Sequence, residues 1–217
     1  MAIIVDYDAG NLKSVQRACA EVGLTAEISA DPAKIARAER IIFPGVGAAG
    51  SGMASVRRNG LDQILLDAFA AKVPMLGICL GLQISLEHSA EQDTKTLGLI
   101  RGDVARFAFE DPSLKIPHMG WNEVRVVNPH PLLADVVPGD EFYFVHGYYP
   151  RPADTDTVFA VSEYETQFAC AIGRANYFGT QFHTEKSGRV GLQLLARFAA
   201  WDGSIPNSSV GGDDRAK

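Results

Sequence analysis

One cysteine stands where its thiol would be chemically active. Cys79 lies between Gly77 and Gly81, directly after the apolar segment 74–78, which predicts a buried strand. Helical character resumes after the second glycine, so the cysteine falls at a sharp strand-to-helix turn, the arrangement of a nucleophile elbow. The start of a helix favours negative charge, so we expect a reactive thiolate. The N–H of Leu80 would then face the oxyanion of a tetrahedral intermediate.

A base for this thiol is present about a hundred residues further along the chain. His183 and Glu185 stand two positions apart, and in an extended segment such side chains share a face. The carboxylate would hold the imidazole in the tautomer that accepts the Cys79 proton. A His-x-Glu pair is common on exposed strand ends, so its meaning depends on the cysteine turn. A metal site would need further ligands such as His118 and His146, but their spacing fits no zinc pattern, and we predict no metal.

The other cysteines and histidines have structural interpretations. Cys19 lies on the apolar face of a predicted helix and Cys170 in an alternating strand, so both are expected in the core. His118 and His146 are expected to be hydrogen-bonded structural residues, and His130 is expected at the surface.

Composition excludes several classes of function. The 217 residues are 47% apolar and carry a net charge of −6, without the basic run that a polyanion binder needs, so nucleic acid is not expected. The longest uncharged stretch near the middle, 73–86, is shorter than the roughly 20 residues that span a bilayer. The N-terminus lacks the basic region of a signal peptide. Three widely spaced cysteines are typical of reduced thiols, so a cytoplasmic protein without membrane contact is expected.

The order of elements predicts how the cysteine and the base are positioned. In the first half, strands at 2–6, 24–28, 40–43 and 74–78 alternate with helices at 11–23, from 31 onwards and at 61–72. This rhythm predicts an α/β fold with a mostly parallel sheet flanked by helices. The second half predicts a mixed or antiparallel extension, with strands at 103–109, 121–127, 141–146, 157–162, 168–173 and 177–183 and a helix at 188–200. We expect one domain over 1–202 and a loose polar tail at 203–217.

The chain resembles the class I, or triad, glutamine amidotransferases over residues 2–200. The segment 77–83 looks like the nucleophile signature of that family, and 181–185 looks like its His-Pro-Glu signature. The resemblance implies a flavodoxin-like fold and a catalytic triad of Cys79, His183 and Glu185. The segment 44–47 resembles the second oxyanion loop of the family. An N–H of Val46 or Gly47 would therefore join that of Leu80 in binding the oxyanion.

Four further segments, 6–15, 118–122, 143–148 and 185–187, look like the branch of this family that serves imidazole glycerol phosphate synthase in histidine biosynthesis. The resemblance implies hydrolysis of L-glutamine to glutamate and ammonia, with no cofactor, in a heterodimer with a (β/α)₈ cyclase that uses the ammonia. The implied contacts with glutamine come from Gln83, Glu91 and the main chain of His146, Gly147 and Tyr148. The implied partner face contains Asn11, Trp121 and Lys186.

Three positions depart from the family pattern, and three other functions stay open. Asp8 and Gly147 replace a usual Gly and Ser, and Thr184 replaces the usual Pro. The chain could serve another synthase, such as pyridoxal phosphate synthase. It could also be a non-catalytic binding subunit of the same fold, or a thiol peptidase or hydrolase on a similar sheet.

Overall fold

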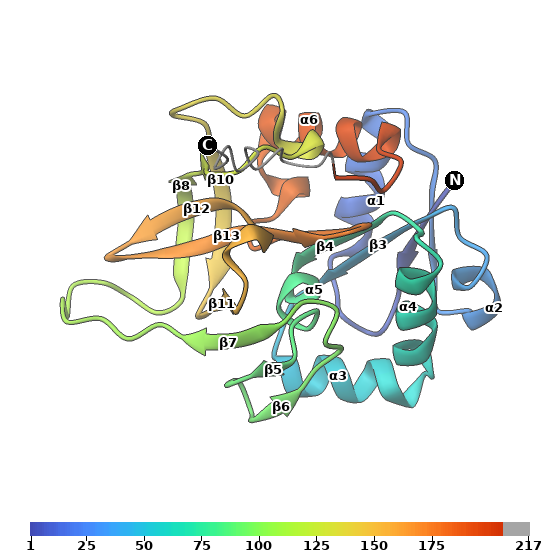
Figure 1. The fold of residues 1–217 in the computed structure, drawn as a ribbon, viewed down its shortest axis with the longest axis horizontal. Coiled ribbons are helices and arrows are strands. Elements are labelled where there is room, and N and C mark those ends of the chain that lie inside the picture. Colours follow the sequence, from blue (N-terminus) through green and yellow to red (C-terminus); the bar gives the residue numbers. More distant parts are fainter. Residues whose placement is uncertain (206–217) are drawn as a thin grey trace, which may run out of the picture.

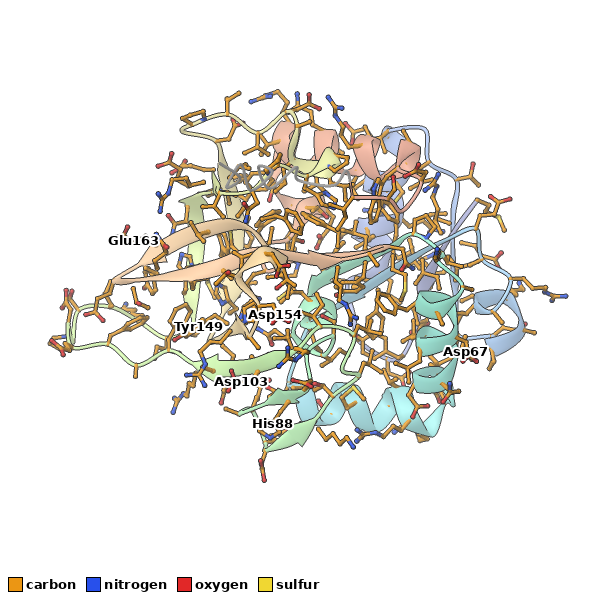
Figure 2. All side chains as sticks on the ribbon, in the orientation of Figure 1. Asp67, His88, Asp103, Tyr149, Asp154 and Glu163 are labelled. Carbon is orange, nitrogen blue, oxygen red and sulfur yellow. The ribbon has the colours of Figure 1, made fainter. Side chains whose placement is uncertain are left out.

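The computed structural model describes residues 1–205. A tail was expected at 203–217, and its residues 206–217 lie outside the described part of the chain. A central sheet runs through the molecule with helices on both of its faces (Figure 1). Side chains fill the space between the sheet and these helices (Figure 2).

The central sheet has eight strands in the order β2-β1-β3-β4-β14-β13-β12-β9. The first five of these are parallel, and β13, β12 and β9 are antiparallel to their neighbours. The α/β prediction, with a parallel first half and a mixed extension, is therefore confirmed. The bounds are β1 (Ala2–Val5), β2 (Ala26–Ser29), β3 (Arg40–Gly45), β4 (Met75–Cys79), β14 (Tyr177–Thr180), β13 (Thr166–Arg174), β12 (Val158–Tyr164) and β9 (Arg125–Val126).

The helices cover both faces of the sheet, and each face has its own core. Neighbouring residues of β1 point to opposite faces, so Ile4 packs with the core under α1 (Leu12–Glu21) and α6 (Gly188–Ala200). Ile3 packs with the core under α3 (Ala49–Arg58) and α4 (Leu61–Ala70). The short helix α2 (Pro32–Ile35) begins at Asp31, whose carboxylate accepts the N–H of Ala33.

Helix α3 was not predicted from the sequence. Its first turns contain Gly50, Ser51 and Gly52, which have low helix propensity and mask the pattern. Gly52 has a packing role, because a Cβ there would lie 3.1 Å from the Leu80 side chain. Tertiary packing therefore overrides local preference in this segment.

Two smaller sheets complete the second half. One pairs β8 (His118–Glu123) with β10 (Glu141–His146), and the other joins β11 (Tyr148–Pro152), β7 (Gly102–Arg106), β5 (His88–Ser89) and β6 (Thr94–Lys95). The strand predicted at 121–127 is in fact two strands, β8 and β9, and that at 103–109 ends at Arg106. Arg151 on β11 donates to Asp103 on β7 across their pairing (2.9 Å), and Asp103 is labelled in Figure 2. Short 3₁₀ helices are η1 (Pro131–Leu133), η2 (Thr155–Thr157) and η3 (Thr184–Lys186).

Three histidines are buried in the neutral form and are called here the buried histidines: His118, His130 and His146. Burial lowers their pKa values to about 4, 3 and 3 respectively. The surface position predicted for His130 is wrong. Its ring stacks on Phe178 with centroids 4.2 Å apart, because the 128–131 turn folds back over the sheet.

Cys19 and Cys170 are core residues, as predicted. Both are fully buried. Burial, reinforced by the negative charge of Glu185, raises the pKa of Cys19 to about 12, and burial raises that of Cys170 well above its usual value. Neither thiol is available as a nucleophile at neutral pH. Over the residues from 1 to 205, none of the helices is long and apolar enough to cross a bilayer.

Candidate active site

The elbow at the end of β4 confirms the predicted turn. Cys79 adopts φ 53° and ψ −105°, a strained conformation for a residue with a side chain, and α5 (Leu80–Gln83) follows at once. The glycines on either side serve close packing. A Cβ on Gly81 would lie 1.7 Å from the carbonyl oxygen of Phe43, and one on Gly77 would lie 2.0 Å from the hydroxyl of Tyr177. The strain is thus held in the cysteine itself by a tightly packed backbone.

His183 and Glu185 form a buried pair beside this elbow. His183 Nδ1 lies 2.8 Å from Glu185 Oε1, and both side chains are at most 2% exposed. The contact was predicted, but the reason given for it was wrong. β14 ends at Thr180, and Glu185 lies in η3, so a 3₁₀ turn brings the carboxylate to the ring.

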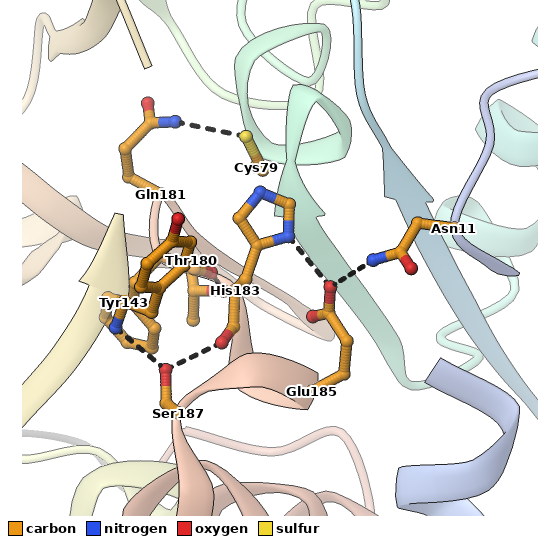
Figure 3. Close-up of polar contacts among 9 residues, drawn as sticks. Asn11, Cys79, Tyr143, Thr180, Gln181, His183, Glu185 and Ser187 are labelled. Atoms are coloured by element: carbon orange, nitrogen blue, oxygen red, sulfur yellow. Dashed lines mark hydrogen bonds and ion pairs between the residues drawn. The ribbon is translucent and has the colours of Figure 1, made fainter. Parts of the chain in front are cut away.

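The imidazole of His183 lies between the carboxylate and the thiol (Figure 3). Burial by itself would lower its pKa, but Cys79 and Glu185 outweigh burial and raise the pKa to about 10. Its buried Nε2 makes no hydrogen bond within residues 1–205 and is available on the side of the sulfur. The site therefore favours the imidazolium form of His183 beside the Cys79 side chain.

Asn11 adds a fourth member to the triad. Its Nδ2 donates to Glu185 Oε1 at 2.8 Å, so the carboxylate oxygen accepts from both the amide and the imidazole (Figure 3). Asn11 has φ 61° at the start of α1 and makes no capping bond with its side chain. Sequence reasoning placed this residue only on the partner face. Its contact with Glu185 was missed because it joins positions 174 residues apart.

A cavity of about 300 Å³ opens in front of Cys79. It brings together every residue predicted for the oxyanion and for glutamine. Its lining is Val46, Gly47, Cys79, Leu80, Gln83, Glu91, Pro117, Val145, His146, Gly147, Tyr148 and His183. Glu91 Oε2 accepts the N–H of Ala49 at 2.7 Å, which orients this carboxylate at the start of α3.

Two of the three residues predicted for the oxyanion, Leu80 and Val46, differ in how their N–H groups are hydrogen-bonded. Leu80 is the first residue of α5, so its N–H has no partner inside that helix. The N–H of Val46 instead donates to the carbonyl of Ala9 at 3.1 Å. The N–H of Val46 would have to leave the Ala9 carbonyl before it could donate to an oxyanion, and Gly47, the alternative donor predicted in the same loop, also lines the cavity.

The residues predicted for the partner face lie close to the site. Trp121 on β8 is 53% exposed, and its ring packs edge-on to Tyr143. Lys186 Nζ lies 5.8 Å from the centre of the same tyrosine ring. Met119, two residues before the tryptophan on the same strand, is 64% exposed. Among the described residues, no group of three or more His, Cys, Asp or Glu side chains could hold a metal ion.

A sequence model for class I glutamine amidotransferases matches residues 3–200, which is nearly all of the described chain. The chain belongs to this family. Within the family, it is 44% identical to the imidazole glycerol phosphate synthase subunit HisH of Chromobacterium violaceum, over 93% of this chain and 98% of that protein. It is 46% identical to the HisH subunits of Neisseria meningitidis serogroup B (91% and 98% covered) and Nitratidesulfovibrio vulgaris (93% and 97% covered). These identities assign this amidotransferase to the HisH branch, as its sequence motifs predicted.

Solved structures of related proteins share the amidotransferase fold at much lower identity. A glutamine amidotransferase superposes with a TM-score of 0.71 at 15% identity, covering 92% of this chain and 99% of that one. PurLQS from Thermotoga maritima also gives 0.71, at 20% identity, with 92% and 97% covered. The flavodoxin-like architecture is therefore confirmed independently of sequence similarity.

Proposed function

We propose that this amidotransferase is the glutaminase subunit of imidazole glycerol phosphate synthase and hydrolyses L-glutamine through a thioester on Cys79. The observation that carries the proposal is the buried His183–Glu185 pair beside the strained thiol, at the edge of a cavity large enough for a small amino acid. The amidotransferase domain spans residues 1–202. The reaction belongs in the cytoplasm, where the thiol stays reduced.

The reaction has two stages. The Cys79 thiolate attacks the side-chain amide carbon of glutamine, and the N–H of Leu80 stabilises the resulting oxyanion. His183, protonated at neutral pH, gives its proton to the departing nitrogen, so that ammonia leaves and a glutamyl thioester remains. The now neutral imidazole takes a proton from water, which attacks the thioester and releases glutamate and the thiolate. Gln83, Glu91 and the main chain of residues 146–148 hold the backbone end of glutamine.

The ammonia is passed to a cyclase subunit of (β/α)₈ type in a heterodimer. The HisH relatives are, by name, subunits of a synthase. The exposed Trp121 and Met119 offer apolar area for such a partner, and Lys186 lies beside them over the Tyr143 ring. Asn11 would connect this face to Glu185.

Replacement of Cys79 by Ala tests the catalytic proposal. We expect glutamate release from glutamine, measured with the cyclase and its ligand present, to fall to background, while circular dichroism and co-purification with the cyclase stay unchanged. Cys19→Ala is the matched control, because it removes a buried thiol that the mechanism does not use, and it should retain turnover. Turnover by the Cys79 variant would overturn the assignment.

Two further measurements separate the alternatives. Labelling of Cys79 by a glutamine-like electrophile distinguishes the enzyme from a binding subunit, in which the thiol would be inert. Identification of the co-purifying subunit distinguishes the cyclase from the partner of another synthase, such as pyridoxal phosphate synthase.

A further inference from the structure

A second buried side chain contacts the Cys79 sulfur and has no part in the steps above. Gln181 is fully buried just after β14, and its Nε2 lies 3.7 Å from Cys79 Sγ (Figure 3). In this view the amide of Gln181 approaches the sulfur from the left, while the imidazole of His183 lies below it. Burial of a primary amide costs free energy unless both its oxygen and its NH₂ group have hydrogen-bond partners. The partners of Gln181 therefore indicate whether its oxygen or its NH₂ group faces the sulfur.

The neighbouring contacts determine which end of this amide faces the sulfur. The carbonyl oxygen of Tyr148 can only accept, so the side-chain nitrogen of Gln83, 2.9 Å away, must be the donor. The same nitrogen donates its second hydrogen to Gln181 Oε1 at 3.1 Å. The oxygen of Gln181 is therefore occupied by Gln83, and its NH₂ group is left to donate to the sulfur.

The orientation is supported further by two of the buried histidines. Tyr148 O also accepts from His146 Nδ1 at 2.8 Å. Burial keeps His146 neutral with a pKa of about 3, so its Nε2 is an acceptor and takes a hydrogen from His118 Nδ1 at 3.3 Å. His118 is neutral for the same reason, and its Nε2 accepts from Asn122 Nδ2 at 3.3 Å. The hydrogen bonds that run from Asn122 through His118 and His146 to the Tyr148 carbonyl thus have one consistent set of donors and acceptors.

We infer that Gln181 is a further catalytic residue, whose side-chain N–H donates to the Cys79 sulfur and stabilises it as a thiolate. The inference rests on the proposed function, because it concerns the nucleophile of that reaction. A thiolate accepts such a bond far better than a thioester sulfur does. The contact therefore favours ionisation of the thiol before attack and departure of the thiolate when water cleaves the thioester.

The test compares two variants of the isolated full chain. Gln181→Met keeps the side-chain volume and removes the donor, and Gln181→Glu keeps the acceptor for Gln83 while placing an oxygen against the sulfur. We expect alkylation of Cys79 by iodoacetamide at pH 7, followed by mass spectrometry, to slow about tenfold in both. With glutamine and the cyclase, kcat should fall while KM stays within about twofold. Gln167→Glu, an exposed position on β13, is the matched control and should alkylate at the wild-type rate.

Wild-type alkylation rates in folded Gln181 variants would overturn the inference. Because alkylation needs no glutamine turnover, a wild-type thiol that alkylates fast without releasing glutamate would refute the proposed function and leave the inference standing. If neither variant gives a native circular dichroism spectrum, Gln83→Met decides instead. It frees the Gln181 amide to rotate and should slow alkylation by roughly threefold, and an unchanged rate would overturn the inference.

Discussion

The charge on Glu185 should control both the rate and the pH range of glutamine hydrolysis. Glu185→Gln removes that charge and keeps the shape of the side chain. The Oε1 atom accepts from His183 Nδ1 and Asn11 Nδ2, each at 2.8 Å, while Oε2 is buried and has no hydrogen bond within the described chain. A glutamine can therefore place its oxygen toward both donors and its NH₂ group in the unpaired position, so the variant should fold.

The size of the effect follows from the loss of charge in a buried contact. A charge-assisted hydrogen bond contributes about 1.5–3 kcal/mol and a neutral one about 0.5–1.5 kcal/mol. The imidazolium of His183 is thus destabilised by roughly 1–2 kcal/mol, which lowers its pKa from about 10 by roughly one unit. The same loss in the transition state should lower kcat/KM by about 5- to 30-fold, because each 1.36 kcal/mol is roughly a factor of ten in rate.

The assay is glutamate release across pH with the cyclase present. His183 must be protonated to give its proton to the departing nitrogen, so activity in the wild type should persist through neutral pH and fall as pH rises through about 10. In Glu185→Gln this alkaline limb should move to lower pH by roughly one unit. Glu163→Gln, at an exposed position on β12, is the control and should leave both rate and limb unchanged. A slower variant whose alkaline limb stays in place would refute the reasoning, because the carboxylate would then not act through the imidazole.

Two further predictions concern stability. The buried histidines have pKa values near 6.5 in the unfolded chain and near 3–4 in the folded protein, so below pH 6.5 the unfolded state binds more protons. Lowering the pH from 7 to 5 should therefore reduce the free energy of unfolding by about 2 kcal/mol for each histidine, and by on the order of 5 kcal/mol for the three together. His183 has a raised pKa, so its contribution is full below about pH 6.5, slightly smaller at pH 7, and lost progressively as pH rises through about 10. Urea unfolding at pH 5 and at pH 7 measures the net difference, and equal stabilities would contradict the assigned neutral forms. Thr184→Pro should raise Tm by about 2 °C in calorimetry, because Thr184 Oγ1 is buried without a partner within residues 1–205 and proline suits the first position of η3. Thr184→Val is its control for loss of the hydroxyl alone, and a lower Tm in the proline variant would show that the position requires its N–H.

Much of the fold follows from local sequence patterns. The strand–helix alternation of the first half and the helix at 188–200 were predicted, because each element buries one apolar face and the spacing of its apolar residues shows it. The elements that were missed or misplaced obey longer-range packing. Helix α3 begins with glycines, one of which, Gly52, makes room for the Leu80 side chain. His130 was expected at the surface, but its ring stacks on Phe178 of the sheet.

Sequence by itself predicted the candidate nucleophile. The glycines on either side of Cys79 leave no room for a Cβ, because Gly77 packs against the Tyr177 hydroxyl and Gly81 against the Phe43 carbonyl. As a motif, they identify the turn without any knowledge of the rest of the chain. The motif that contains His183 and Glu185 likewise indicated a base, although the turn that joins them was not the one expected.

Only the tertiary structure decided what surrounds the sulfur. β4 and β14 are parallel neighbours with Ile78 opposite Thr180, so their carboxyl ends deliver Cys79 and His183 to the same edge of the sheet. The contacts of Asn11 with Glu185 and of Gln181 with Cys79 depend on the same strand order and on one direction of each amide. Local sequence encodes neither, because strand order and amide direction are set by partners far away in the chain.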